Sequence, residues 1–445
     1  MREELHSNLG FYNSAFIKMH VKTTEDLQDF GNISIETEAT YFHEFIHFLQ
    51  DITTTYGLMN ISNIVDYIKY SNDFIINDGK PDFTVPIEPT ASLDHDVKAN
   101  WELKKIYLGG GEGKNDIAQV NSICKCATKV VTKAGNVTPE KLVLDYNDSL
   151  GRNYKYSIGA YCICESMAYA MEQCLYPDVL IKPNKLPYES IKIICDELLP
   201  GLSADPLNII ALCDVSLMSF NPGAFLYDTL LSIAKIGIPN VPEDIYRHAY
   251  SNVTFNYQGH TTFQQLLISQ GALAINQLGD YFTTIHFKEN KSWINYTISS
   301  GIDLRLTRPF FMLDIARNGK ILDGKKINNT FFNGILYKLG SPLTVNDSFE
   351  ITLFPPQAYS YDTLPEYFWV INQVYKIYSN KLNQGTYKCE MIEWCNKSCQ
   401  EIEVEEWTDE RCRNAPWERS KDPDPNPCTF GRLWKTWGLM DEYPV

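Results

Sequence analysis

The stretch Tyr41-Phe42-His43-Glu44-Phe45-Ile46-His47-Phe48-Leu49-Gln50 places two histidines four residues apart, with an acid directly after the first. In a helix, residues four apart lie one above the other on the same face. The apolar residues recur at helical spacing on a separate stripe, which consists of Phe42, Phe45, Ile46, Leu49 and Ile52. This pattern predicts a helix over 35–54, with Ser34 as its N-cap and Gly57 as its end.

The order His-Glu-x-x-His within such a helix is typical of zinc hydrolases. His43 and His47 are therefore predicted to bind Zn²⁺ through their ring nitrogens, and Glu44 to act as the general base toward water. A purely structural helix with two satisfied core histidines is the alternative. It does not explain why the polar pair faces away from the apolar stripe.

Composition narrows the class of protein. The 445 residues carry a net charge of −16, which argues against a nucleic-acid-binding surface as the main function. The first residues contain no apolar segment typical of a signal peptide, and no run of 18 apolar residues predicts a membrane span. Twelve cysteines without an export signal favour reduced thiols, so we expect a cytoplasmic protein.

The length predicts two or three domains in an α+β fold that is mostly helical. Alternation over 16–23 predicts a strand before the motif helix, and the edge of a sheet there could hold an extended peptide. A hairpin is expected over 141–158, a helix around Cys124-Lys125-Cys126, and strands at 335–338 and 349–353. Further helices are predicted at 61–72, 159–172, 188–199, 208–218, 224–236, 242–250, 260–280, 303–317 and 363–380.

The helix over 159–172 carries Glu165 among apolar neighbours, where a glutamate is rare unless it is paired or bound to metal. The motif at 43–47, followed by a later helix with Glu165-Ser166-Met167-Ala168-Tyr169, resembles the gluzincin metallopeptidases. In that group a glutamate on a later helix is the third zinc ligand. The resemblance implies a zincin-like domain over 1–320, in which Glu165 completes the site and an insertion occupies about 73–140.

Two further residues of the same helix enter the prediction. Glu172 lies seven residues after Glu165 on the same face and is the rival third ligand. Tyr169 shares this face and could donate a hydrogen bond to a developing oxyanion, although a role as a core aromatic explains it equally well. The longer metzincin motif is absent, because Gln50 and Thr53 stand where that motif has Gly and the last His.

The amino-acid composition changes twice in the C-terminal part of the chain. Residues 321–388 are predicted to be a mixed α/β segment, and 389–445 a tail that holds five of the twelve cysteines and five of the eight tryptophans. In this tail a second, structural zinc site is predicted from four thiols: Cys395, Cys399, Cys412 and Cys428. Free thiols are the alternative.

The leading hypothesis from these observations is a zinc metallopeptidase that hydrolyses a protein or peptide substrate. Two alternatives stay open. One is a non-catalytic zincin-like protein that acts through contacts of its acidic, tryptophan-rich tail. The other is a metallohydrolase that cleaves an amide bond outside peptides.

Overall fold

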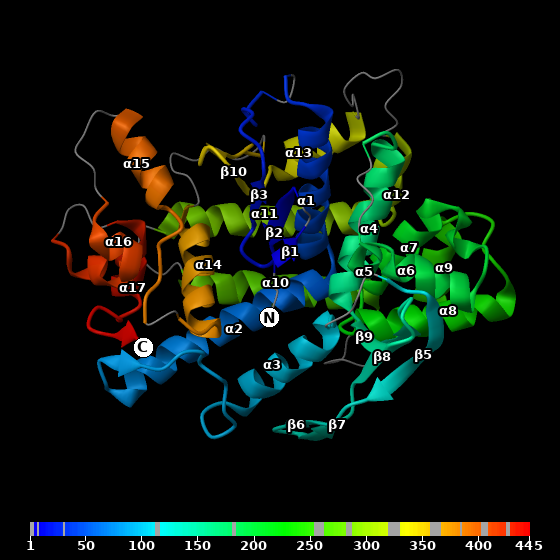
Figure 1. The fold of residues 1–445 in the computed structure, drawn as a ribbon, viewed down its shortest axis with the longest axis horizontal. Coiled ribbons are helices and arrows are strands. Elements are labelled where there is room, and N and C mark those ends of the chain that lie inside the picture. Colours follow the sequence, from blue (N-terminus) through cyan, green and yellow to red (C-terminus); the bar gives the residue numbers. More distant parts are fainter. Residues whose placement is uncertain are drawn as a thin grey trace.

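The computed structural model describes all residues of the chain except those in a set of short segments. These segments are 1–3, 7–8, 30–31, 112–115, 180–183, 253–261, 282–286, 319–329, 357–365, 383–384, 402–407 and 424–427. The described chain is an α+β structure in which helices predominate and the sheets are small (Figure 1). This confirms the predicted class.

The motif helix is the centre of the fold. Helix α1 (Ile35–Thr53) begins as predicted at Ser34, whose side chain accepts a hydrogen bond from the backbone N–H of Thr37. Every residue of α1 from Thr37 onward is buried. The helix therefore lies inside the molecule rather than on its surface.

The predicted span of 35–54 is confirmed, because α1 ends at Thr53, but the prediction that Gly57 ends the helix is wrong. Helix α2 (Thr55–Asp78) starts directly after Thr54 and includes Gly57 in its first turn. A Cβ atom at position 57 would lie 2.4 Å from the carbonyl oxygen of Asp51. Glycine is thus needed because the two helices approach each other closely at this corner, not because the chain stops there.

A five-stranded sheet covers α1. Its strands, in spatial order, are β1 (Glu4–His6), β2 (Gly10–Asn13), β3 (Lys18–Val21), β10 (Leu343–Asn346) and β11 (Ile351–Thr352). β3 and β11 confirm the strands expected at 16–23 and 349–353. β10 runs parallel to β3, so that Val345 lies beside His20 and a late part of the chain completes the N-terminal sheet.

The strand predicted at 335–338 is wrong, because these residues belong to helix α13 (Thr330–Leu339). The helix predicted at 303–317 is in fact two helices, the end of α11 (Lys288–Thr307) and α12 (Phe311–Asn318). The other predicted helices are present. They are α2, which contains 61–72, α4 (Ala160–Leu175), α6 (Ser190–Leu198), α7 (Pro206–Ser216), α8 (Pro222–Ile236), α9 (Glu243–Asn252), α10 (Phe263–Tyr281) and α14 (Glu366–Ser379). Helices α3 (His95–Leu108) and α5 (Lys185–Tyr188) are present in addition.

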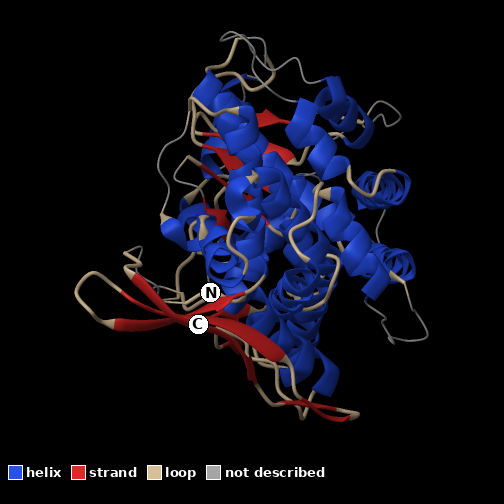
Figure 2. Ribbon diagram, turned by 90° about the vertical axis from the view of Figure 1, so that its right-hand side faces the viewer, coloured by secondary structure: helices blue, strands red, loops and turns tan. Residues whose placement is uncertain are grey.

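A second sheet lies outside the helical body, at the lower right of Figure 1 and among the strands at the lower edge of Figure 2. It consists of β5 (Gln119–Ala127), β8 (Glu140–Asn147) and β9 (Asn153–Ile158), all antiparallel. β8 and β9 confirm the predicted hairpin. The helix expected around Cys124 is wrong, because these residues form β5; a ribbon of β6 (Val130–Thr132) and β7 (Gly135–Val137) follows.

The C-terminal tail packs onto the main body through aromatic side chains. It contains α15 (Ile392–Glu401), α16 (Glu410–Asn414), the 3-10 helix η3 (Pro416–Lys421), α17 (Thr429–Thr436) and β12 (Tyr443–Pro444). Trp434 is fully buried and packs against both Phe83 and Tyr378, and β12 pairs in parallel with β4 (Asp82–Phe83). Within the described residues no helix is long and apolar enough to cross a membrane.

Candidate metal centre

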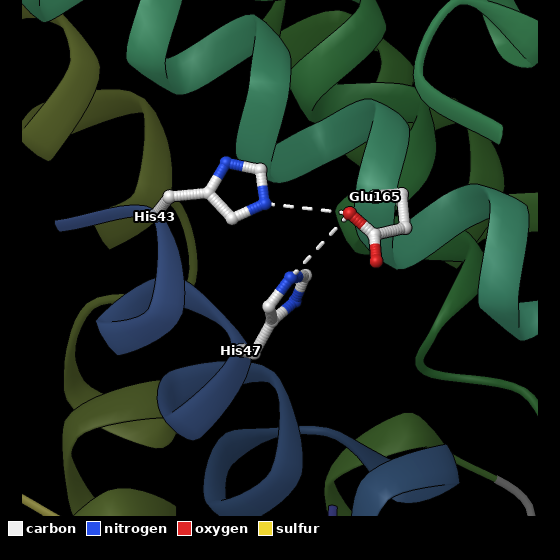
Figure 3. Close-up of side chains that lie close together, drawn as sticks. All are labelled: His43, His47 and Glu165. Carbon is white, nitrogen blue, oxygen red and sulfur yellow. Dashed lines mark hydrogen bonds and ion pairs between the residues drawn. The ribbon is translucent and has the colours of Figure 1, made fainter. Parts of the chain in front are cut away.

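Helices α1 and α4 lie against each other and bring three potential metal ligands together (Figure 3). Nε2 of His43 is 3.3 Å from Oε2 of Glu165, and Nε2 of His47 is 3.7 Å from the same oxygen. Their ligand atoms lie within 4.8 Å of one another, and no other group of three His, Cys, Asp or Glu side chains does so in the described part of the chain.

The outer nitrogen of each imidazole is held by a partner that fixes the tautomer. Nδ1 of His47 lies 2.8 Å from Oε1 of Gln50, and the Gln50 amide in turn donates to the carbonyl oxygen of Cys164. An amide oxygen only accepts, so Nδ1 of His47 donates this hydrogen bond and Nε2 is the nitrogen that faces Glu165. Glu172 acts in the same way on His43, with Oε2 3.0 Å from Nδ1. Both rings therefore aim a metal-binding nitrogen at Glu165.

Two buried polar atoms of this group make no hydrogen bond. His43, His47 and Glu165 are all at most 2% exposed. Nε2 of His47 and Oε1 of Glu165 are buried and make no hydrogen bond. Unsatisfied buried polar atoms are costly, and a cation among them would satisfy both. Two imidazole nitrogens and one carboxylate also form the kind of donor set that zinc and similar divalent ions prefer.

The charges of the group are consistent with this interpretation. Burial alone would raise the pKa of Glu165, but the two histidines lower it below its ordinary value, so the carboxylate is ionised. Burial would lower the pKa of His43, but Glu165 and Glu172 raise it well above its ordinary value. Without metal, a proton on His43 balances the carboxylates, and a divalent cation would take over that role.

Glu44 is completely buried beside this group, under the N-terminal sheet. Strand β2 passes directly over it, since a Cβ atom on Gly10 would lie 3.1 Å from Cγ of Glu44 and 2.9 Å from Cγ2 of Thr40. The sheet therefore keeps Glu44 out of bulk water. Such surroundings strengthen its interaction with any proton or charge nearby.

Tyr188 is a site residue that the sequence reasoning missed. Its ring centroid is 6.1 Å from that of His43 and 6.1 Å from that of Tyr169. Burial raises the pKa of Tyr188, and the charges of Glu165 and Glu44 raise it further. No local sequence pattern pointed to it, because it belongs to the four-residue helix α5 and reaches the centre only in the folded chain.

Tyr169 lies on α4 with Glu165, and its predicted role as a hydrogen-bond donor to an oxyanion stays a prediction. Burial raises its pKa, and a hydrogen bond with the Gln173 side chain opposes this shift. The charges that influence it come from Glu189 and Glu172. Tyr169 thus packs against Tyr188, which in turn lies beside His43.

A pocket adjoins the centre on the side of His47. Its space, including the open mouth, is about 550 Å³. Most of its lining residues belong to α1 to α4, among them Ile64, Leu108 and Ala160, and Leu217 at the end of α7 adds to it. At its floor Asp51 is buried, which raises its pKa to about 7.

The predicted thiol site in the tail is not tested by the structure. Cys395, Cys412 and Cys428 do not form a group of three ligands within 4.8 Å among the described residues. The side chain of Cys399 lies outside those residues. The four-thiolate site therefore stays a prediction.

Comparison with known proteins adds no assignment, because no family model, curated protein or solved structure matches the chain.

Proposed function

We propose that this chain is a zinc-dependent metallopeptidase of the gluzincin type, with a zincin-like catalytic domain. The observation that supports this most is the buried group of His43, His47 and Glu165, which joins the two motif histidines to a glutamate 118 residues further along the chain. Both histidines are held through hydrogen bonds at Nδ1, which leaves Nε2 toward Glu165, and Glu44 is buried beside them. These observations also support the proposal.

The roles of the residues follow from their positions. His43, His47 and Glu165 would hold the ion, and zinc bound there supplies a Lewis acid that polarises a carbonyl and makes water more acidic. Glu44 takes a proton from the attacking water and delivers it to the leaving nitrogen of the scissile bond. Tyr188 donates a hydrogen bond to the oxygen on which negative charge develops. The pocket beside His47 would contact part of the substrate.

The test combines metal content with cleavage of a complex peptide mixture. The wild-type chain is expected to bind one zinc in this centre and to cleave peptides, detected by mass spectrometry. His43→Ala should lose both the metal and cleavage, because a ligand is missing. Glu44→Gln should keep the metal and lose at least about 100-fold in rate, the lower range for general-base catalysis.

Glu36→Gln is the matched control, because Glu36 is an exposed acid in the first turn of the same helix. It should retain both properties. Full cleavage by Glu44→Gln would contradict the mechanism. Zinc binding without cleavage of any peptide would instead favour the non-catalytic scaffold.

A further inference from the structure

A pair of thiols lies on the second sheet, away from the metal centre. Sγ of Cys124 and Sγ of Cys126 are 3.9 Å apart, close enough for one thiol to donate to the other. Cys124 is exposed and Cys126 is half-buried. Both are on β5, which is an edge strand of the sheet.

The strand register places both thiols on the solvent face of the sheet. Leu142 and Leu144, on the opposite face, are fully buried against the helical body. Cys124 pairs with Val143 and Cys126 with Lys141, so these residues share the outer face. Burial raises the pKa of the Cys124 thiol, Cys126 adds to this shift, and Lys155 of β9 opposes it. The outer face therefore presents two soft donors from one strand.

The spacing favours a bridging ion over a disulfide. Residues two apart in a strand have Cα atoms about 6.4–6.8 Å apart, from a rise of about 3.2–3.4 Å per residue. This is the upper limit of the Cα separation of about 4.4–6.8 Å in disulfides. In contrast, two metal–sulfur bonds of about 2.3 Å would span the observed separation at a sulfur–metal–sulfur angle of about 116°. No movement of the strand is then required.

The number of sulfur ligands indicates which metal ion this thiol pair can bind. No third His, Cys, Asp or Glu side chain among the described residues forms a ligand group with the two sulfurs. Structural zinc takes four protein ligands, which this face does not provide. A soft monovalent ion is satisfied by two or three thiolates.

We propose that Cys124 and Cys126 form a surface dithiolate site that binds one Cu(I) ion. Its third coordination position is open to a small thiol from solution. Because both sulfurs are accessible from one side, the ion can be exchanged through that third position. The proposal is independent of the peptidase activity. It concerns strand β5 rather than helices α1 and α4, and copper rather than zinc.

The test uses the full chain, reduced, loaded with zinc and kept free of oxygen. Cu(I) is supplied in competition with a coloured Cu(I) chelator, and the copper retained per chain is measured. The wild type should retain one equivalent that Cys124→Ser/Cys126→Ser loses. The matched control, Cys174→Ser, alters a half-buried cysteine on α4 and should retain it.

A second measurement uses only the wild type. Cu(I) should protect Cys124 and Cys126 from alkylation, as read by mass spectrometry of the corresponding peptide. Equal copper retention by the double variant would overturn the proposal. So would equal alkylation with and without copper, or a thiol pair that is recovered as an internal disulfide and binds no copper.

Discussion

At the scale of single residues, the two carboxylates of α4 have different tasks that the structure separates. Glu165 points at the Nε2 atoms of both histidines, whereas Glu172 contacts the outer nitrogen of His43. Glu165 is therefore a candidate ligand and Glu172 a positioning residue. A carboxylate behind a ligating histidine raises the basicity of the ring and fixes its orientation.

This difference predicts unequal effects on zinc affinity. Glu172→Gln should weaken zinc binding about 10–100-fold, as is usual for residues that orient a ligand. Glu165→Gln should weaken it far more, because it removes an anionic ligand from a completely buried position. Competition with a chromophoric chelator measures both affinities. If Glu172→Gln lost more affinity than Glu165→Gln, the two roles would have to be exchanged.

The two tyrosines can be separated in the same manner. Tyr188→Phe removes the hydroxyl of the ring that lies beside His43, so kcat should fall about 10²–10³-fold while zinc content stays constant. Tyr169→Phe removes a hydroxyl that interacts with Gln173 and should change kcat much less. Steady-state kinetics on a cleaved peptide gives both values. An unchanged kcat for Tyr188→Phe would exclude it as the oxyanion donor.

The motif residues could be predicted from the sequence because their geometry is local. Two histidines four apart on one helix need only a helix, and the apolar stripe and Ser34 supply it. The position of Glu165 relative to them depends on how α4 packs on α1, for which the chain provides only a family resemblance. Tyr188 and the contact between Gln50 and His47 depend on tertiary packing or rotamers, and no spacing rule encodes them.

At the scale of elements, a buried ion pair fixes the end of the motif helix. Arg305 of α11 makes two hydrogen bonds to Asp214 of α7, at 2.6 and 2.7 Å, and donates through Nε to the carbonyl oxygen of Thr53. Asp214 also accepts from the Tyr246 hydroxyl. Three helices are thus tied together at the C-terminal end of α1.

Removing one partner of this pair should be costly. Asp214→Asn leaves the Arg305 charge buried without its counter-ion, and we expect a loss of about 3–5 kcal/mol in the free energy of unfolding. Asp303→Asn is the control, because Asp303 pairs with Lys338 on the surface of the same helix and should cost less than about 1 kcal/mol. Urea denaturation measures both. Equal effects of the two variants would argue against the role of Asp214 in anchoring α1.

Local sequence patterns predicted single helices and strands better than they predicted which strands pair with each other. The hairpin at 141–158 follows from alternation around a turn. The strand β5 was missed because its alternation involves cysteine, lysine and serine rather than a clear apolar repeat. The pairing of β10 with β3 joins residues more than 300 positions apart, and no short-range signal in either strand specifies the other.

At the scale of the whole molecule, the net charge of −16 and the buried acids both lower the stability of the folded chain as the pH rises. Burial raises the pKa of Glu366 to about 7 and that of Asp66 to about 6. Each group stays protonated in the folded chain at pH values where the unfolded chain has released the proton. Stability should therefore fall as the pH rises from about 4.5 to 7, the interval between the unfolded and folded pKa values of a buried glutamate. Growing repulsion among the excess carboxylates adds to this fall.

Glu366→Gln tests this pH dependence directly. The amide keeps the shape of the protonated acid and cannot ionise, so the variant should be more stable than wild type above pH 7, by up to about 3 kcal/mol. Below pH 4.5 the two proteins should be nearly equal, because the wild-type acid is then protonated in both states. Urea denaturation between pH 4 and 8, with excess zinc present wherever the centre binds it, gives the two profiles. Glu393→Gln, an exposed acid on α15, is the control and should leave the profile unchanged. If Glu366→Gln followed the wild-type slope across this interval, ionisation of Glu366 would have no part in it, and the decline would have to come from the other buried acids or from general charge repulsion.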